Sequence, residues 1–110
     1  MNGRATSSIY IRVKRFDETY FLLCDEYETV ESLKNRLIVV LQRMKFELPK
    51  QEEPLTIDDL RFCIKNRVLD NGSTCHDQQV FNDSVIYVCF RKPGTKDEFD
   101  ELEKVANQDF

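Results

Sequence analysis

One amphipathic segment, flanked on both sides by alternating segments, most constrains the fold of this 110-residue chain. Apolar residues recur at helical spacing from Val30 to Met44, and Thr29 can cap the first turn. We therefore predict a helix over residues 29–44, with Lys34 on its polar face. The flanking segments alternate apolar and polar residues with a period of two, which is typical of half-buried strands. These segments are residues 9–14, 19–24, 61–65, 68–69 and 85–90.

The order of these elements predicts an α+β fold rather than an alternating parallel α/β fold. We expect one mixed sheet of four to five strands, with the helix packed across one face. In that arrangement Leu33 and Leu37 of the helix meet Ile86 and Val88 of the last strand in a common core. Residues 45–56, which contain two prolines, are predicted to form a long surface loop.

Charge is unevenly distributed along the chain. Asp and Glu number 20 and Lys and Arg number 16, so the net charge is −4 at pH 7. The acidity is concentrated after the Pro93-Gly94 pair, which is typical of a break between segments. We therefore divide the chain into a flexible N-terminal segment (1–8), a folded domain (9–92) and an acidic C-terminal tail (93–110).

Composition also excludes several classes of function. A net-acidic chain is unlike proteins whose main task is to bind nucleic-acid phosphates. No apolar run approaches the ~18 residues that cross a bilayer, and the N-terminal residues do not resemble a secretion signal. We therefore expect a cytoplasmic or nuclear protein that binds neither nucleic acid nor membranes.

The four cysteines lack the spacing of a metal site. No two cysteines have the spacing of a C-x-x-C pair, because they stand far apart in the sequence, as Cys24, Cys63, Cys75 and Cys89. His76 is the only histidine. We expect free thiols, no metal and no cofactor, with Cys24 and Cys75 filling the core. The alternative is a small redox-responsive or metal-binding protein that uses the four cysteines. No phosphate-binding loop or catalytic triad is present, so we expect no enzymatic activity.

Three segments carry a family resemblance. They are the helix opening Thr29-Val30-Glu31-Ser32-Leu33-Lys34, the stretch from Ile57 to Thr74 with its basic turn and D-N-G-S-T sequence, and Asp83-Ser84 before the last strand. Together with the first hairpin, their order and separation across residues 9–92 resemble the ubiquitin-like family. The resemblance implies a β-grasp fold and a non-covalent protein-interaction module. Cys75 departs from the family pattern, because a leucine usually stands there.

The hairpin and the helix opening look most like elongin B, an adaptor that pairs with elongin C. This likeness implies a protein partner, for example an elongin C-like subunit, and a role in an intracellular complex of ubiquitin ligation or transcription elongation. Conjugated members of the family end in Gly-Gly, whereas this chain contains no Gly-Gly. We therefore do not expect it to be a conjugatable modifier.

Family members commonly bind partners through the solvent face of the sheet. A small centre of thiols and one aromatic ring, with a basic rim, would attract acidic partners there. The alternative is an ordinary solvated sheet face. The outward positions on this face are predicted to be Arg61, Cys63, Lys65, Tyr87, Cys89 and Arg91.

A second candidate surface is an apolar strip formed by Tyr10, Phe21 and Leu23, which point away from the predicted core. The alternative is that the long loop or the N-terminal segment covers it. Residues 97–106 can form an acidic amphipathic turn, which docks on a partner, docks on its own domain or frays.

Overall fold

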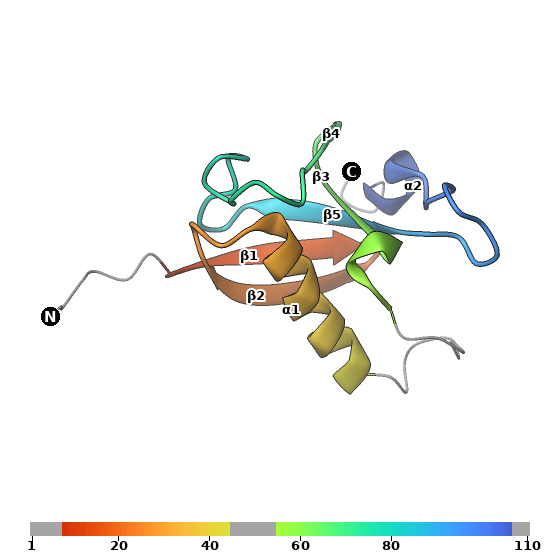
Figure 1. Cartoon of the computed structure of the whole chain (residues 1–110), viewed down its shortest axis with the longest axis horizontal. Coiled ribbons are helices and arrows are strands. Elements are labelled where there is room, and N and C mark those ends of the chain that lie inside the picture. The colour runs from red at the N-terminus through yellow and green to blue at the C-terminus, as the bar shows by residue number, and fades with distance from the viewer. Residues whose placement is uncertain (1–7, 45–54, 107–110) are drawn as a thin grey trace, which may run out of the picture.

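The computed structural model describes residues 8–44 and 55–106 of the chain (Figure 1). Its elements follow the predicted order. They are β1 (Ser8–Arg15), β2 (Glu18–Asp25), α1 (Val30–Arg43), the 3₁₀ helix η2 (Ile57–Asp59), β3 (Leu60–Ile64), β4 (Arg67–Val68), β5 (Val85–Phe90) and α2 (Leu102–Ala106).

The strands of the described residues form one mixed sheet in the order β2-β1-β5-β3-β4. The central strands β1 and β5 run parallel, and the other neighbouring pairs are antiparallel. The helix α1 lies across one face of this sheet (Figure 1). The predicted α+β fold, with one helix packed across a mixed sheet, is therefore confirmed.

The main helix begins and ends where its sequence predicts. The Thr29 side chain accepts a hydrogen bond of 3.1 Å from the Ser32 backbone N–H, which satisfies one of the free donors of the first turn. The helix ends at Arg43. Most of the predicted loop, residues 45–54, lies outside the described residues, as do residues 1–7 and 107–110.

The interior between α1 and the sheet contains the predicted core. Leu33, Leu37, Ile86 and Val88 are fully buried in one cluster, as the alternation and the helical spacing predicted. Phe62 of β3 is the largest fully buried side chain of the described residues. The expectation that Cys24 and Cys75 fill this core is also confirmed, because both belong to the cluster.

Lys34 departs from its predicted position on the polar face of the helix. Its side chain is only 4% exposed, and Nζ donates a hydrogen bond of 2.8 Å to the Leu60 carbonyl oxygen. Nζ also lies 5.8 Å from the centre of the Phe62 ring. The long aliphatic stem of lysine reaches over the edge of the core, and the first residue of β3 supplies the acceptor that the ammonium group needs. The prediction for this residue was wrong.

Replacing this lysine by the Lys34→Met substitution is expected to remove a pH dependence of stability. Burial lowers the pKa of Lys34 from its ordinary 10.5. Between the folded and unfolded pKa values the unfolded chain binds more protons than the folded protein, so stability rises with pH. The wild-type free energy of unfolding should therefore increase relative to that of the variant as the pH is raised towards the ordinary pKa of 10.5, measured by urea unfolding. Parallel pH profiles would contradict this expectation.

Candidate functional site

The first candidate surface, on the sheet face opposite α1, is not open. Cys63 and Cys89, which we expected to be exposed there, are 2% and 1% exposed. Both are buried without belonging to the main core cluster, as are Val105 and Ala106 of α2. The expected exposure of the two thiols was wrong, because the chain after β5 folds back over this face.

Backbone and side-chain contacts fix the returning segment in place. The Asp100 side chain accepts a hydrogen bond from the Phe90 backbone N–H at 3.0 Å, and the Asp100 N–H donates to the Phe90 carbonyl oxygen at 2.8 Å. The Arg15 side chain contacts the same carboxylate oxygen of Asp100 twice. Its Nη2 lies 2.9 Å from this oxygen, and its Nε donates a hydrogen bond to it at 3.0 Å. The Phe16 N–H donates to the Val105 carbonyl oxygen at 3.0 Å. Of the fates considered for residues 97–106, the structure shows docking on their own domain.

The basic rim of the first surface is engaged as well. The Arg61 guanidinium lies 4.1 Å from the centre of the Phe99 ring, on the returning segment. Arg91 contacts the same ring at 5.2 Å and is ion-paired with Asp59 at 3.1 Å. Lys65 lies outside the strand in which we placed it, in the β3–β4 turn, with a positive φ of 54°.

Tyr87 of β5 remains half-buried on this face. The structure therefore does not gather the six predicted residues into one open patch. A binding role for Arg61, Tyr87 and Arg91 stays a prediction.

The second candidate surface is present. Phe21 and Leu23 of β2 are 67% and 72% exposed. In the β1–β2 pairing Tyr10 lies opposite Leu23, and Arg12 lies opposite Phe21, so the four side chains share the face turned away from α1. Tyr10 is half-buried. We call Tyr10, Phe21 and Leu23 the β2 strip.

Two residues of the β2 strip, Phe21 and Leu23, belong to an edge strand, while Tyr10 belongs to the neighbouring strand β1. Within the described residues β2 pairs only with β1, so alternate backbone N–H and C=O groups of β2 point away from the sheet. A long, exposed, apolar edge of this kind can pair with another chain. The strand is also bordered by acidic residues at both ends, with Asp17 and Glu18 at one end and Asp25 and Glu26 at the other.

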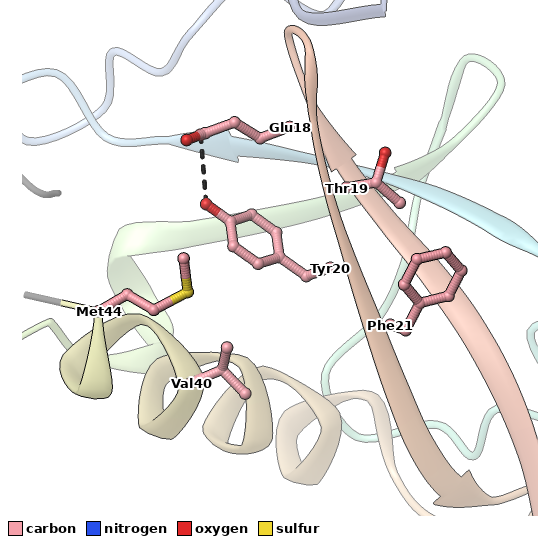
Figure 2. Close-up of a pocket in the computed structure, with 6 residues that line it drawn as sticks. All are labelled: Glu18, Thr19, Tyr20, Phe21, Val40 and Met44. Atoms are coloured by element: carbon pink, nitrogen blue, oxygen red, sulfur yellow. Dashed lines mark hydrogen bonds between the residues drawn. The ribbon is translucent and has the colours of Figure 1, made fainter.

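A groove of about 500 Å³ lies between β2 and the C-terminal half of α1 (Figure 2). Figure 2 shows Val40 of α1 and Met44, which caps the C-terminus of this helix, facing the Tyr20 ring of β2. The Tyr20 hydroxyl donates a hydrogen bond to Glu18 at 3.2 Å. The groove therefore combines an apolar floor with one carboxylate at its end. Its lining residues are Glu18, Thr19, Tyr20, Phe21, Val40 and Met44.

Helical spacing places Val40 and Met44 on the apolar, core-facing side of the predicted helix, so the groove was not predicted. A signal was present in the run Ile38-Val39-Val40-Leu41, because one helix face cannot bury four consecutive apolar residues. In the structure Ile38 and Leu41 are buried, whereas Val39 is exposed and Val40 is half-buried. The helix thus presents apolar surface beyond what the sheet covers.

Comparisons with known proteins agree with this fold. No family model and no curated protein sequence matches the chain. Among solved structures, the chain is similar to the solution structure of the N-terminal ubiquitin-like domain in the 4931431F19Rik protein. The TM-score is 0.65, the sequence identity is 15%, and the match covers 89% of this chain and 92% of that chain. The protein therefore has a ubiquitin-like β-grasp fold, as the sequence resemblance predicted.

Two further features bear on the alternatives. No helix among the described residues is long and apolar enough to cross a membrane. Within residues 8–44 and 55–106, no three His, Cys, Asp or Glu side chains lie together as ligands for a metal ion.

Proposed function

We propose that this protein is a non-covalent protein-interaction module, an adaptor or subunit of a cytoplasmic or nuclear complex, without catalytic activity of its own. One observation carries the proposal: the edge strand β2 exposes Phe21 and Leu23 beside an apolar groove. The ubiquitin-like fold supports it, because domains of this fold commonly bind other proteins.

The occupant that fits this surface best is an extended apolar segment of a partner protein. Such a segment can add a strand to β2 through the outward-facing backbone groups of the edge. An apolar side chain of the segment would then enter the groove between Tyr20 and Val40, while Phe21 and Leu23 contact the partner's other side chains. Acidic residues at both ends of β2 favour basic residues on either side of that apolar segment.

We expect the Phe21→Ser and Leu23→Ser double variant to lose partner binding while remaining folded. Each exposed apolar anchor at an interface contributes about 1–3 kcal/mol, so affinity should fall at least about tenfold. The measurement is affinity purification from cells with quantitative mass spectrometry of the captured proteins. The matched control is Val68→Ser, which removes an exposed apolar side chain at the opposite edge of the sheet. Equal capture by the double variant and the wild type would reject the β2 strip as the binding surface.

A finer proposal is that the module works as elongin B does, with an elongin C-like subunit as its partner. Its support is the likeness of the hairpin and the helix opening in the sequence. Co-expression with elongin C, followed by size-exclusion chromatography, tests this point separately. Failure to co-purify would reject the elongin B-like role, while the capture experiment above still decides whether the protein is an interaction module.

A further inference from the structure

The part of the chain that folds back after β5 lies on the sheet as a bound peptide lies on its receptor. We call residues 97–106 the returning segment, and the turn at residues 93–96 joins it to the domain. It contains α2 and lies beyond the last strand (Figure 1). The five-stranded sheet is complete before this segment begins, so the segment can leave the sheet while every strand keeps its neighbours.

An aromatic anchor of the returning segment lies against two cations. The centre of the Phe99 ring lies 4.1 Å from the Arg61 guanidinium carbon and 5.2 Å from that of Arg91. Both distances are within the range of cation–π attraction. Arg61 belongs to β3 and Arg91 directly follows β5, so a ring at this point is held from two neighbouring strands. Arg91 and Phe99 also form an antiparallel backbone bridge.

A carboxylate anchor follows the aromatic one directly. The Asp100 carboxylate lies 2.9 Å from Nη2 of Arg15 and accepts a hydrogen bond from the Phe90 backbone N–H at 3.0 Å. The Arg15 guanidinium carbon lies 4.3 Å from the centre of the Phe90 ring, which keeps the cation in place for its acidic partner. This position therefore recognises a carboxylate through one side chain and one backbone group of the domain.

An apolar anchor completes the contacts of the returning segment. Val105 is fully buried, Ala106 is buried beside it, and α2 packs on β5 and β1. The Phe16 N–H donates to the Val105 carbonyl oxygen at 3.0 Å, which fixes α2 against the β1–β2 turn. Residues 99–106 thus carry an aromatic, an acidic and an apolar anchor in one short stretch of chain.

The charges of the two sides are complementary. Three arginines of the domain contact the returning segment, and we call Arg15, Arg61 and Arg91 the arginine surface. Residues 97–103 contain no lysine or arginine. Their acidic members are Asp97, Glu98, Asp100, Glu101 and Glu103. Opposite charge steers an acidic segment to such a surface and disfavours a basic one.

We propose that the arginine surface is a second protein-binding site, whose ligand is an acidic segment of a partner protein with a phenylalanine followed by an aspartate. The returning segment has the same chemistry and competes with this ligand. Because it is tethered to the domain, its effective concentration is high, and a partner binds only the fraction of molecules in which the surface is open. The arginine surface is separate from the β2 strip, so this proposal does not depend on the proposed function.

The test measures binding of a fluorescein-labelled peptide with the sequence of residues 96–106 to the full chain, by fluorescence anisotropy. The wild type should bind weakly, because its own segment occupies the surface. The full-chain double variant Phe99→Ala and Asp100→Ala lacks two anchors of the segment and keeps the whole arginine surface. It should bind the peptide at least about tenfold more tightly than the wild type.

Two matched controls assign the binding site. A peptide with alanine in place of its phenylalanine and of the aspartate that follows should bind neither protein. Adding Arg61→Ala to the double variant should remove most of the gain, whereas adding Arg43→Ala, at an exposed position of α1, should leave the gain unchanged. The gain should also shrink as salt is raised, because salt screens exposed charges.

Equal binding of the peptide by the wild type and the double variant would overturn the proposal, provided that N-ethylmaleimide labels Cys63 and Cys89 of the folded variant and so shows that the face is open. If the variant is unfolded or stays closed, NMR of the wild type decides. Peptide on the order of millimolar, near the effective concentration of a short tether, should then shift the amide signals of Phe90 and Arg91. Unchanged signals would overturn the proposal. A wild-type dimer that the peptide dissociates would make a second copy of the chain the occupant and would overturn the assignment to a partner.

Discussion

Ending the chain after Lys92 is expected to lower the free energy of unfolding by about 3–5 kcal/mol. Val105 is fully buried, and full burial of a valine side chain contributes about 1.5–3 kcal/mol. Loss of Asp100 removes a partly buried ion pair with Arg15 and leaves the Phe90 N–H without its acceptor, which costs about 1–3 kcal/mol more. The sum is an upper estimate, because unfolded chains already bury part of their apolar surface. Urea unfolding monitored by circular dichroism measures the loss.

The same truncation should make Cys63 and Cys89 reactive in the folded protein. Both thiols lie on the face that the segment covers, and in the full chain they are shielded from solvent. Brief treatment with N-ethylmaleimide under native conditions, followed by peptide mapping, should label both residues in the truncated protein and neither in the full chain. The control is Glu103→Ala, at an exposed position of α2, which should leave both measurements unchanged. If the truncated protein is as stable and as unreactive as the full chain, the segment is not the cover that the structure shows.

Local pattern was sufficient to predict the side of the sheet that faces α1. Alternation assigns the apolar residues of β1 and β5 to one face of the sheet, and helical spacing assigns Leu33 and Leu37 to one face of α1. In the structure these residues all belong to one core cluster. The cap at Thr29 is equally local, because it depends on residues three positions apart. These features could be predicted because each involves neighbours in the sequence or a fixed periodicity.

The opposite face could not be predicted in the same way. Alternation correctly predicted that Cys63 and Cys89 point away from the main core. It does not predict which part of the chain covers the sheet face opposite α1. Their cover comes from Phe99, Asp100 and α2, which reach the sheet only after the chain reverses beyond β5. Such long-range contacts leave no periodic signal in the strand itself. An acidic segment therefore looked like a separate tail, although Asp100 is held by Arg15.

The groove is a second feature that sequence patterns alone could not predict. Whether Val40 and Met44 are core or surface depends on how far the sheet extends beneath the helix, and that follows from strand order and register rather than from helical spacing. The β2 strip was easier to predict, because alternation along the strand alone places Phe21 and Leu23 on the side away from the core, where both are exposed. Sequence patterns thus locate an exposed strip, while the depth of a groove requires the fold.

The substitution of phenylalanine by alanine should have opposite consequences on the two faces of this sheet. Phe62→Ala removes the largest fully buried side chain of the described residues and leaves a cavity against α1. The expected loss is about 3–5 kcal/mol of unfolding free energy, from lost transfer energy and lost contacts around the cavity. Phe21→Ala, at a side chain that is 67% exposed, should change stability by less than about 0.5 kcal/mol.

Urea unfolding of both variants at one pH gives the comparison, and partner capture completes it. Phe21→Ala should weaken capture while leaving the unfolding midpoint in place, because its ring contributes to the surface and not to the core. Phe62→Ala should lower the midpoint, while the fraction that stays folded still captures the partner through an unchanged β2 strip. Equal destabilisation by the two substitutions would contradict the assignment of Phe62 and Phe21 to opposite faces. If capture by both variants falls only in proportion to the fraction of protein that is folded, Phe21 does not contribute to binding. That result would reject the binding role of the β2 strip and would leave the assignment of the fold unchanged.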